Sequence, residues 1–203
     1  ALRTWIKRAV ARYGADLAPE AIEGLVQKVG NDLRLLRQEC HKLATYVGEG
    51  GSIALNHVEK MIPRSLEDNV FKLIDEMGKM NIAGALDIFY DLVKKREEPI
   101  KILALMARQF RIILQVKELN ARGYSQKQAA STLGLHPYPV KIAAQQGQLF
   151  SERSLQKLLL EANRTDYAIK SGQKEKTLAV EWYLLSMKQW VRASHEPRTK
   201  DMS

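Results

Sequence analysis

The chain has 203 residues, of which 45% are hydrophobic and 27% are charged. This length and composition suit one domain or two small ones with real cores, and they exclude a disordered polymer. No apolar run approaches the roughly 20 residues of a membrane span, and one cysteine, Cys40, excludes an intramolecular disulfide framework. We therefore expect a cytoplasmic protein without membrane contact, in which Cys40 is a buried small hydrophobe.

The net charge of +9 is concentrated in the second half of the chain. Residues 99–203 hold 17 basic and 8 acidic side chains, whereas the first 98 residues are neutral overall. This excess favours a polyanion or an acidic neighbouring subunit as partner. The N-terminus is charged throughout, so it does not match a signal peptide. It lacks an initiator Met, and we expect a fragment or a processed product.

Apolar residues follow the 3.6-residue period along almost the whole chain, and no convincing alternating strand is found, which predicts an all-α fold. Helices are expected at about residues 2–13, 19–29, 31–47, 55–61, 67–78, 82–95, 99–122, 126–133, 138–147, 152–170 and 177–193.

Pro63 and the polar residues after it divide these helices into two groups. We place a linker at residues 63–65, between a small helical subdomain, residues 1–62, and a larger helical bundle, residues 66–193. The polar tail, residues 194–203, has no apolar period and is expected to be frayed.

Within the larger bundle, the short GKMN turn predicts that the helices at 67–78 and 82–95 form an antiparallel hairpin. Apolar positions nearly encircle the next helix between Ile100 and Met106, which predicts a central helix covered on several sides.

The sequence gives no support for catalysis or for a bound metal or cofactor. The four histidines, His41, His57, His136 and His195, are scattered, and neither a P-loop nor a Gly-x-Ser-x-Gly elbow is visible. Glu97 and Glu98 are adjacent, so on a helix their carboxylates diverge. We expect no catalytic residue, no metal ligand and no cofactor.

Residues 125–149 resemble a helix-turn-helix, with Ser125 as a helix cap and a Gly-Leu turn before the second helix. That helix would present side chains able to read base edges: Tyr138, Lys141, Gln145 and Gln146. The alternative is an ordinary corner between two packed helices. Two prolines at the start of the second helix favour this alternative, because they remove backbone donors.

Basic residues near a glycine-containing turn, Lys170, Lys174 and Lys176, are candidate phosphate contacts together with Lys141. The alternative is a solvated loop. Three aromatic residues of the last helix, Trp182, Tyr183 and Trp190, favour core and interface packing over base stacking.

Residues 30–51, GNDLRLLRQECHKLATYVGEGG, read as a helix with Asp32 as its N-cap and a glycine-rich end. A helix that begins with Gly-x-Asp-x-Arg resembles a helix in the lid subdomain of AAA+ proteins. In this resemblance Arg34 would hold the sensor-2 position. The alternative for Arg34 is an exposed helix arginine that pairs with Gln38 or a nearby acid.

The lid-like segment is followed by a characteristic series of segments: SLEDNVFKLIDEM, GALDIFYDL, PIKILALMARQFRIILQVKEL, LHPYPVK and IKSG. Their order resembles the C-terminal two-thirds of the delta subunit of the bacterial DNA polymerase III clamp loader, from about residue 2 to about 190.

This resemblance implies an AAA+-type lid at residues 1–62 and a helical collar at 66–193. In such loaders the collars of five subunits form a ring, other subunits hydrolyse ATP, and delta opens the sliding clamp. The clamp-contacting element belongs to an N-terminal domain that we expect this chain to lack. The resemblance thus implies a non-catalytic assembly module for DNA replication. Its partners would be other loader subunits and primer–template DNA, and Arg34 would have no nucleotide to contact.

Two other functions stay open at this point. One is a sequence-specific DNA-binding regulator that uses residues 125–149. The other is a fragment of a different AAA+ protein, such as a helicase loader. An intact phosphate-binding loop upstream of Ala1 would favour the latter.

Overall fold

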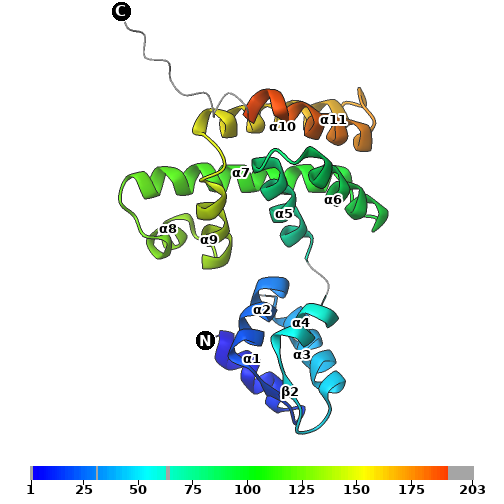
Figure 1. The fold of residues 1–203 in the computed structure, drawn as a ribbon, viewed down its shortest axis with the longest axis vertical. Coiled ribbons are helices and arrows are strands. Elements are labelled where there is room, and N and C mark those ends of the chain that lie inside the picture. Colours follow the sequence, from blue (N-terminus) through cyan, green and yellow to red (C-terminus); the bar gives the residue numbers. More distant parts are fainter. Residues whose placement is uncertain (1, 31, 63–64, 192–203) are drawn as a thin grey trace, which may run out of the picture. The chain divides into compact units, whose positions relative to one another are not determined.

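A computed structural model describes residues 2–30, 32–62 and 65–191. The described residues form eleven α-helices and two very short strands (Figure 1). Every expected helix is present, with ends within two residues of those observed, so the all-α prediction is confirmed. Most of the expected linker and the expected frayed tail lie outside the described residues.

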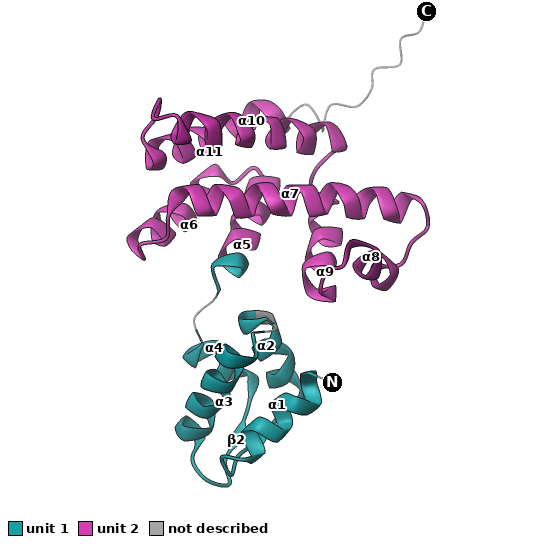
Figure 2. Ribbon diagram, turned by 180° about the vertical axis from the view of Figure 1, so that it is seen from behind, with its two compact units in different colours: residues 1–68 teal, residues 69–203 magenta. Residues whose placement is uncertain are grey.

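The chain divides into two compact units, residues 1–68 and 69–203 (Figure 2). We call them unit 1 and unit 2 and describe each separately.

Unit 1 contains four helices around one apolar core. These are α1 (Leu2–Ala11), α2 (Pro19–Val29), α3 (Leu33–Val47) and α4 (Leu55–Met61). Ile6, Leu25, Leu36 and Leu43 are fully buried in this core, as is Cys40, so the expected buried position of Cys40 is confirmed. Burial, and after it the charge of the neighbouring Glu39, raises the pKa of the Cys40 thiol to about 11, which keeps the thiol protonated.

The all-α fold also contains one very short pair of strands. β1 (Asp16–Leu17) and β2 (Ser52–Ile53) pair in parallel, with Asp16 opposite Ser52 and Leu17 opposite Ile53. Two residues are too few to produce the alternating pattern by which a strand is recognised.

The beginning of α3 follows the sequence prediction. The side chain of Asp32 accepts hydrogen bonds from the backbone N–H groups of Arg34, at 2.9 Å, and Leu35, at 3.0 Å. The helix ends at Gly48, whose φ of 78° is readily adopted by glycine.

Unit 2 is built around its longest helix, α7 (Pro99–Ala121). The other helices are α5 (Leu66–Gly78), which begins at the boundary between the units, α6 (Ile82–Lys94), α8 (Gln126–Leu133), α9 (Pro137–Gln146), α10 (Glu152–Lys170) and α11 (Lys176–Val191). Figures 1 and 2 show α10 and α11 on one side of α7, and α5, α8 and α9 on the other. The buried positions of α7 include Ile102, Met106, Phe110 and Ile113, which confirms it as a central helix covered from several sides.

The predicted antiparallel hairpin of α5 and α6 is wrong. α6 packs against α11, whereas α5 makes little contact with α6. The buried face of α5 is covered instead by residues at and after the end of α9. A Cβ at Gly78 would lie 2.7 Å from a side-chain atom of Leu149, and the backbone oxygen of Phe71 accepts a hydrogen bond from Gln146. A short turn limits the distance between helix ends but leaves the crossing angle to the packing partners.

Candidate partner-binding surface

The most prominent exposed feature of unit 2 is an apolar stripe on α11. Leu178, Trp182 and Leu185 follow one another at intervals of four and three residues, so they share one side of the helix. Their exposed fractions are 61%, 61% and 42%. Large apolar side chains aligned on one exposed helix face are typical of an interaction site.

The neighbouring helix α10 extends this surface. Its exposed residues Leu160 and Tyr167 are separated by two helical turns, and Tyr167 is 66% exposed. A groove of about 380 Å³ between the two helices is lined by Arg153, Gln156, Lys157, Leu160, Gln189 and Trp190. Gln189 follows Leu185 by four residues, so the groove continues the stripe. We call Leu160, Tyr167, Leu178, Trp182 and Leu185 the α10–α11 apolar face.

The opposite sides of both helices are locked into the core, which holds this face rigidly. Tyr183 is buried and donates its hydroxyl to the carbonyl of Leu158, at 3.0 Å. The Ser154 hydroxyl donates to the carbonyl of Trp190, also at 3.0 Å. Burial raises the pKa of the Tyr183 hydroxyl far above its usual range, so it stays a donor at any physiological pH.

The three aromatic residues of α11 occupy different positions. Tyr183 belongs to the core, and Trp190 packs on it with ring centroids 5.4 Å apart. Trp182 points to the exposed side. The expected core packing is confirmed for Tyr183, whereas interface packing by Trp182 stays a prediction.

Charged groups border the groove. Glu161 accepts from Lys157 at 2.7 Å and from Arg164 at 2.8 Å. The hydrogen bond from Lys157 is the main cause of the lowered pKa of the Glu161 carboxyl. Burial opposes it, and the charge of Arg164 adds to the lowering. A polar rim around an apolar centre is the usual organisation of a protein–protein interface.

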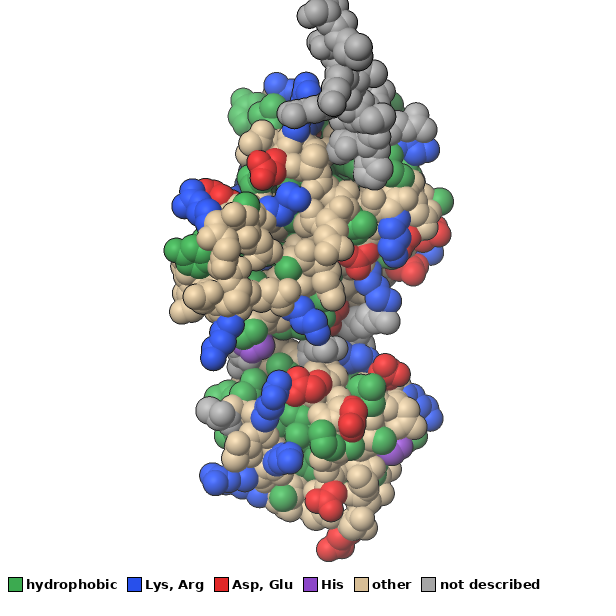
Figure 3. All heavy atoms as spheres, turned by 60° about the vertical axis from the view of Figure 1, so that its left-hand side comes forward, with side chains coloured by type: hydrophobic (Ala, Val, Ile, Leu, Met, Phe, Trp, Pro, Cys, Tyr) green, Lys and Arg blue, Asp and Glu red, His purple; other side chains and the backbone are tan. Residues whose placement is uncertain are grey.

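The four lysines proposed as DNA contacts are all exposed, but two of them already have carboxylate partners. Lys170 pairs with Asp166 at 2.7 Å, and Lys176 pairs with Glu98 at 2.6 Å. Lys141 and Lys174 make no ion pair with another described residue. On the face shown in Figure 3, acidic and basic side chains are interspersed over unit 2 rather than gathered in one basic patch. DNA contact by these lysines stays a prediction.

The α8–α9 corner has the local caps that the sequence predicted. Ser125 accepts from the backbone N–H of Gln128, whose side chain in return accepts from the N–H of Ser125, and α8 ends at Gly134 with φ 63°. His136 caps α9 through its ring nitrogen.

The groove-reading interpretation of α9 fails at Gln146, which was expected on the presented face. Gln146 is 1% exposed. It donates to the carboxylate of Asp75, at 2.8 Å, and accepts from Gln109, at 2.9 Å. Together with its bond to the backbone of α5, these contacts tie α9 to α5 and α7. Lys141 and Gln145 are exposed. The exposed face of α9 therefore includes these two side chains but lacks Gln146.

In unit 1, the side chain of Arg34 is exposed, and it makes no ion pair or hydrogen bond with another described residue. The expected pairing with Gln38 or an acid is therefore not seen. Its sensor-2-like role stays a prediction. Among the described residues, no three His, Cys, Asp or Glu side chains gather so that they could hold a metal ion. No helix in the described part of the chain is long and apolar enough to cross a membrane.

Comparison with known proteins connects this architecture to a replication protein. The family described as the C-terminal domain of the DNA polymerase III delta subunit matches residues 67–187, which cover nearly all of the helices of unit 2. The chain belongs to the DNA polymerase III delta subunit family. This confirms the resemblance inferred from the ordered segments.

Individual delta relatives agree with this assignment. The DNA polymerase III subunit delta of Bacillus subtilis (strain 168) is 44% identical over 171 residues, which are 84% of this chain and 49% of that protein. A probable delta subunit of Aquifex aeolicus (strain VF5) is 24% identical over 155 residues, 75% of this chain and 44% of that protein. The chain thus spans about half the length of the curated delta relatives it matches.

A solved delta structure also matches both the sequence and the fold. The DNA clamp loader delta protein of Bacillus subtilis superimposes with a TM-score of 0.81 at 40% identity, over 93% of this chain and 56% of that one. No comparison supports a DNA-binding regulator.

Proposed function

We propose that this chain is a non-catalytic part of a clamp-loader delta subunit and that unit 2 assembles with other loader subunits. The observation that carries the proposal is the agreement of sequence and fold with a clamp loader delta protein over 93% of the chain. In this proposal residues 1–62 are an AAA+-type lid, 63–65 a linker and 66–193 the collar. Its location is the cytoplasm.

The α10–α11 apolar face is the proposed contact with a neighbouring loader subunit. It offers a central exposed tryptophan, Trp182, on a helix pair held together by two hydrogen bonds. Tryptophans at the centre of an interface often dominate its binding energy, because they bury a large area with little loss of conformational freedom. The polar rim around Glu161 would select the orientation rather than supply most of the affinity.

The test is reconstitution. The 203-residue chain is mixed with the remaining loader subunits of the same organism, and complexes are separated by size-exclusion chromatography. We expect the chain to join the loader or to compete with full-length delta for it. A chain that neither joins nor competes would refute the assembly role.

Trp182→Asp tests the location of the contact. A carboxylate in an apolar interface should weaken assembly by about 30-fold or more, since interface tryptophans commonly contribute at least 2 kcal/mol. Tyr124→Asp is the matched control. Tyr124 is also an exposed aromatic residue of unit 2, with an exposed fraction of 42%. It lies in the turn before α8, a helix that Figure 1 shows on the other side of α7 from α10 and α11. Equal assembly of both variants would place the contact elsewhere.

A further inference from the structure

Unit 1 contains a pocket that the assembly role does not use. It lies between α1 and α3 and has a volume of about 140 Å³. Its walls are Trp5, Arg8, Ala9, Arg12, Tyr13 and Arg37. Three of the six side chains are arginines, and none carries a negative charge.

The arginines of this pocket lack carboxylate partners. Arg8, Arg12 and Arg37 make no ion pair with any described residue, whereas Arg3 on the same helix pairs with Glu23 at 2.8 Å. The C-terminal end of α1 attracts the cations of Arg8 and Arg12. It does not account for Arg37, which lies within α3, so the convergence of cations from two helices is unexplained by local structure.

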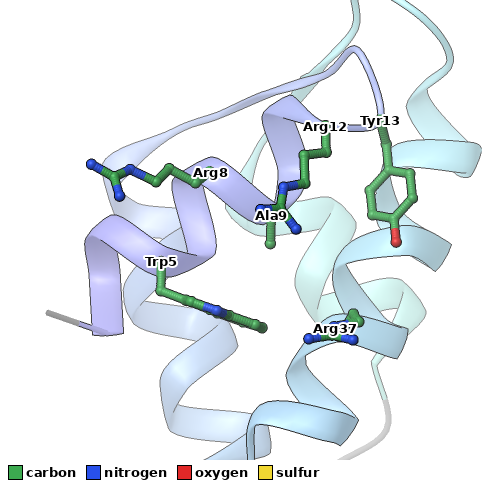
Figure 4. A pocket seen from close by; sticks show the side chains of 6 residues that line it. All are labelled: Trp5, Arg8, Ala9, Arg12, Tyr13 and Arg37. Atoms are coloured by element: carbon green, nitrogen blue, oxygen red, sulfur yellow. The ribbon is translucent and has the colours of Figure 1, made fainter.

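The side chains are arranged around a shared space. Figure 4 shows the guanidinium groups of Arg12 and Arg37 reaching into the space between the helices, with the Trp5 indole beside them, while the Arg8 guanidinium points away. The Tyr13 ring packs on His41 with centroids 4.6 Å apart, which holds the phenol at the rim. The indole is partly buried against the core of unit 1, so this wall is fixed by the fold.

This donor set suits one class of ligand. A guanidinium presents parallel N–H donors that match two oxygens of an anion. Two guanidinium groups, one from the turn after α1 and one from α3, with a phenol hydroxyl near them, offer more donors than the two oxygens of a carboxylate use readily. A tetrahedral phosphate has enough oxygens for all of them. The volume is well below the 300 Å³ or more of a site for a whole drug-sized ligand, so the pocket fits the phosphate group rather than an entire nucleotide.

We propose that the pocket formed by Arg12, Arg37, Trp5 and Tyr13 binds a phosphate group, borne by a nucleic-acid strand or by a free nucleotide. The guanidinium groups hold the phosphate oxygens, and the indole contacts the adjoining sugar or base. The proposal is independent of the α10–α11 apolar face and of the assembly role.

The test is isothermal titration calorimetry on the 203-residue chain with three probes: pyrophosphate, ATP and a twelve-residue thymidine oligonucleotide. An acidic peptide of matched charge tests whether carboxylates bind in place of phosphates. The indole N–H resonance of Trp5, assigned with Trp5→Phe, reports locally whether a probe reaches the pocket. We expect every phosphate probe that binds to shift this resonance, and the acidic peptide to leave it unchanged.

The variants distinguish binding at this specific site from non-specific binding to positive charge. R12Q combined with R37Q should weaken phosphate binding at least tenfold, because two charge-assisted contacts are lost. Arg37→Lys keeps the charge but removes the parallel N–H donors of the guanidinium, and it should weaken binding severalfold. Lys7→Gln is the matched control, because Lys7 is an exposed cation of α1 outside the pocket, and it should change affinity less than twofold.

Each outcome decides the proposal. An oligonucleotide that binds much more tightly than ATP identifies the nucleic-acid backbone as the source of the phosphate, and comparable affinities identify a free nucleotide. Both results support the phosphate site. Absence of binding, an equal loss of affinity in Lys7→Gln, or an acidic peptide that binds as tightly as ATP would overturn it.

Discussion

Gln146 provides the sharpest test of how unit 2 is held together. Its amide donates to the backbone oxygen of Phe71, at 3.0 Å, and to Asp75, at 2.8 Å, and its oxygen accepts from Gln109, at 2.9 Å. Gln146→Ala removes all three hydrogen bonds and leaves Gln109, which is 2% exposed, without its acceptor. At roughly 1 kcal/mol for each bond, unfolding of unit 2 should require about 3 kcal/mol less free energy.

Urea unfolding measures this effect. On a Trp5→Phe background the remaining tryptophans, Trp182 and Trp190, both lie in unit 2 and report its unfolding. With an m-value of about 2 kcal/mol/M, a loss of about 3 kcal/mol lowers the midpoint by about 1.5 M. Gln145→Ala, the exposed neighbour on the same helix, is the control and should shift the midpoint by less than about 0.3 M.

The comparison of the two glutamines also decides between two interpretations of α9. If both residues faced a DNA groove, neither substitution would affect stability appreciably. A shift below about 0.3 M for Gln146→Ala, or equal shifts for the two variants, would refute the reasoning from burial and hydrogen bonding.

Three further predictions follow from local contacts. Gly78→Ala places a methyl group 2.7 Å from a side-chain atom of Leu149, so we expect a loss of about 1–3 kcal/mol in stability; an unchanged melting temperature would contradict this. Because the pKa of buried Cys40 is about 11, a thiol reagent at pH 8 should label the native chain far more slowly than the urea-unfolded chain, and equal rates would be inconsistent with burial. The hydrogen bond from Lys157 lowers the pKa of Glu161, so the ionised carboxylate stabilises the fold above the usual glutamate pKa of about 4.3. Glu161→Gln should therefore be less stable than the parent chain at pH 7, and the difference should shrink as the pH falls from about 5 through the lowered pKa; a difference independent of pH would count against the ion pair.

The helices could be predicted because their determinants are local. Asp32 and Ser125 cap helices through their own side chains, and Pro99 begins α7 where its missing N–H is not needed. Near-continuous apolar residues on α7 likewise indicated a helix covered from several sides. The family could be identified from the sequence because the characteristic segments occur in the same order along the chain as in the delta subunit.

The features that the sequence did not reveal depend on contacts between distant residues. Gln146 is one of the buried residues of α9, and its amide is satisfied by Gln109 and Asp75, which are 37 and 71 residues away. The outward position of Trp182 and the inward position of Tyr183 were likewise fixed by packing on α10. The arginine pocket was missed because Arg12 and Arg37 are separated by 24 intervening residues and meet only when α1 packs on α3.

One side chain of unit 1 fixes the end of α4. The ammonium group of Lys28, on α2, donates to the carbonyls of Val58, Glu59 and Ile62 at the end of α4, at 3.2, 3.0 and 2.6 Å. These carbonyls form the negative end of the helix, and a cation there stabilises it. Ile62 is therefore anchored to a different helix, rather than left to fray. These contacts fix the end of α4, and Lys28→Met should release it.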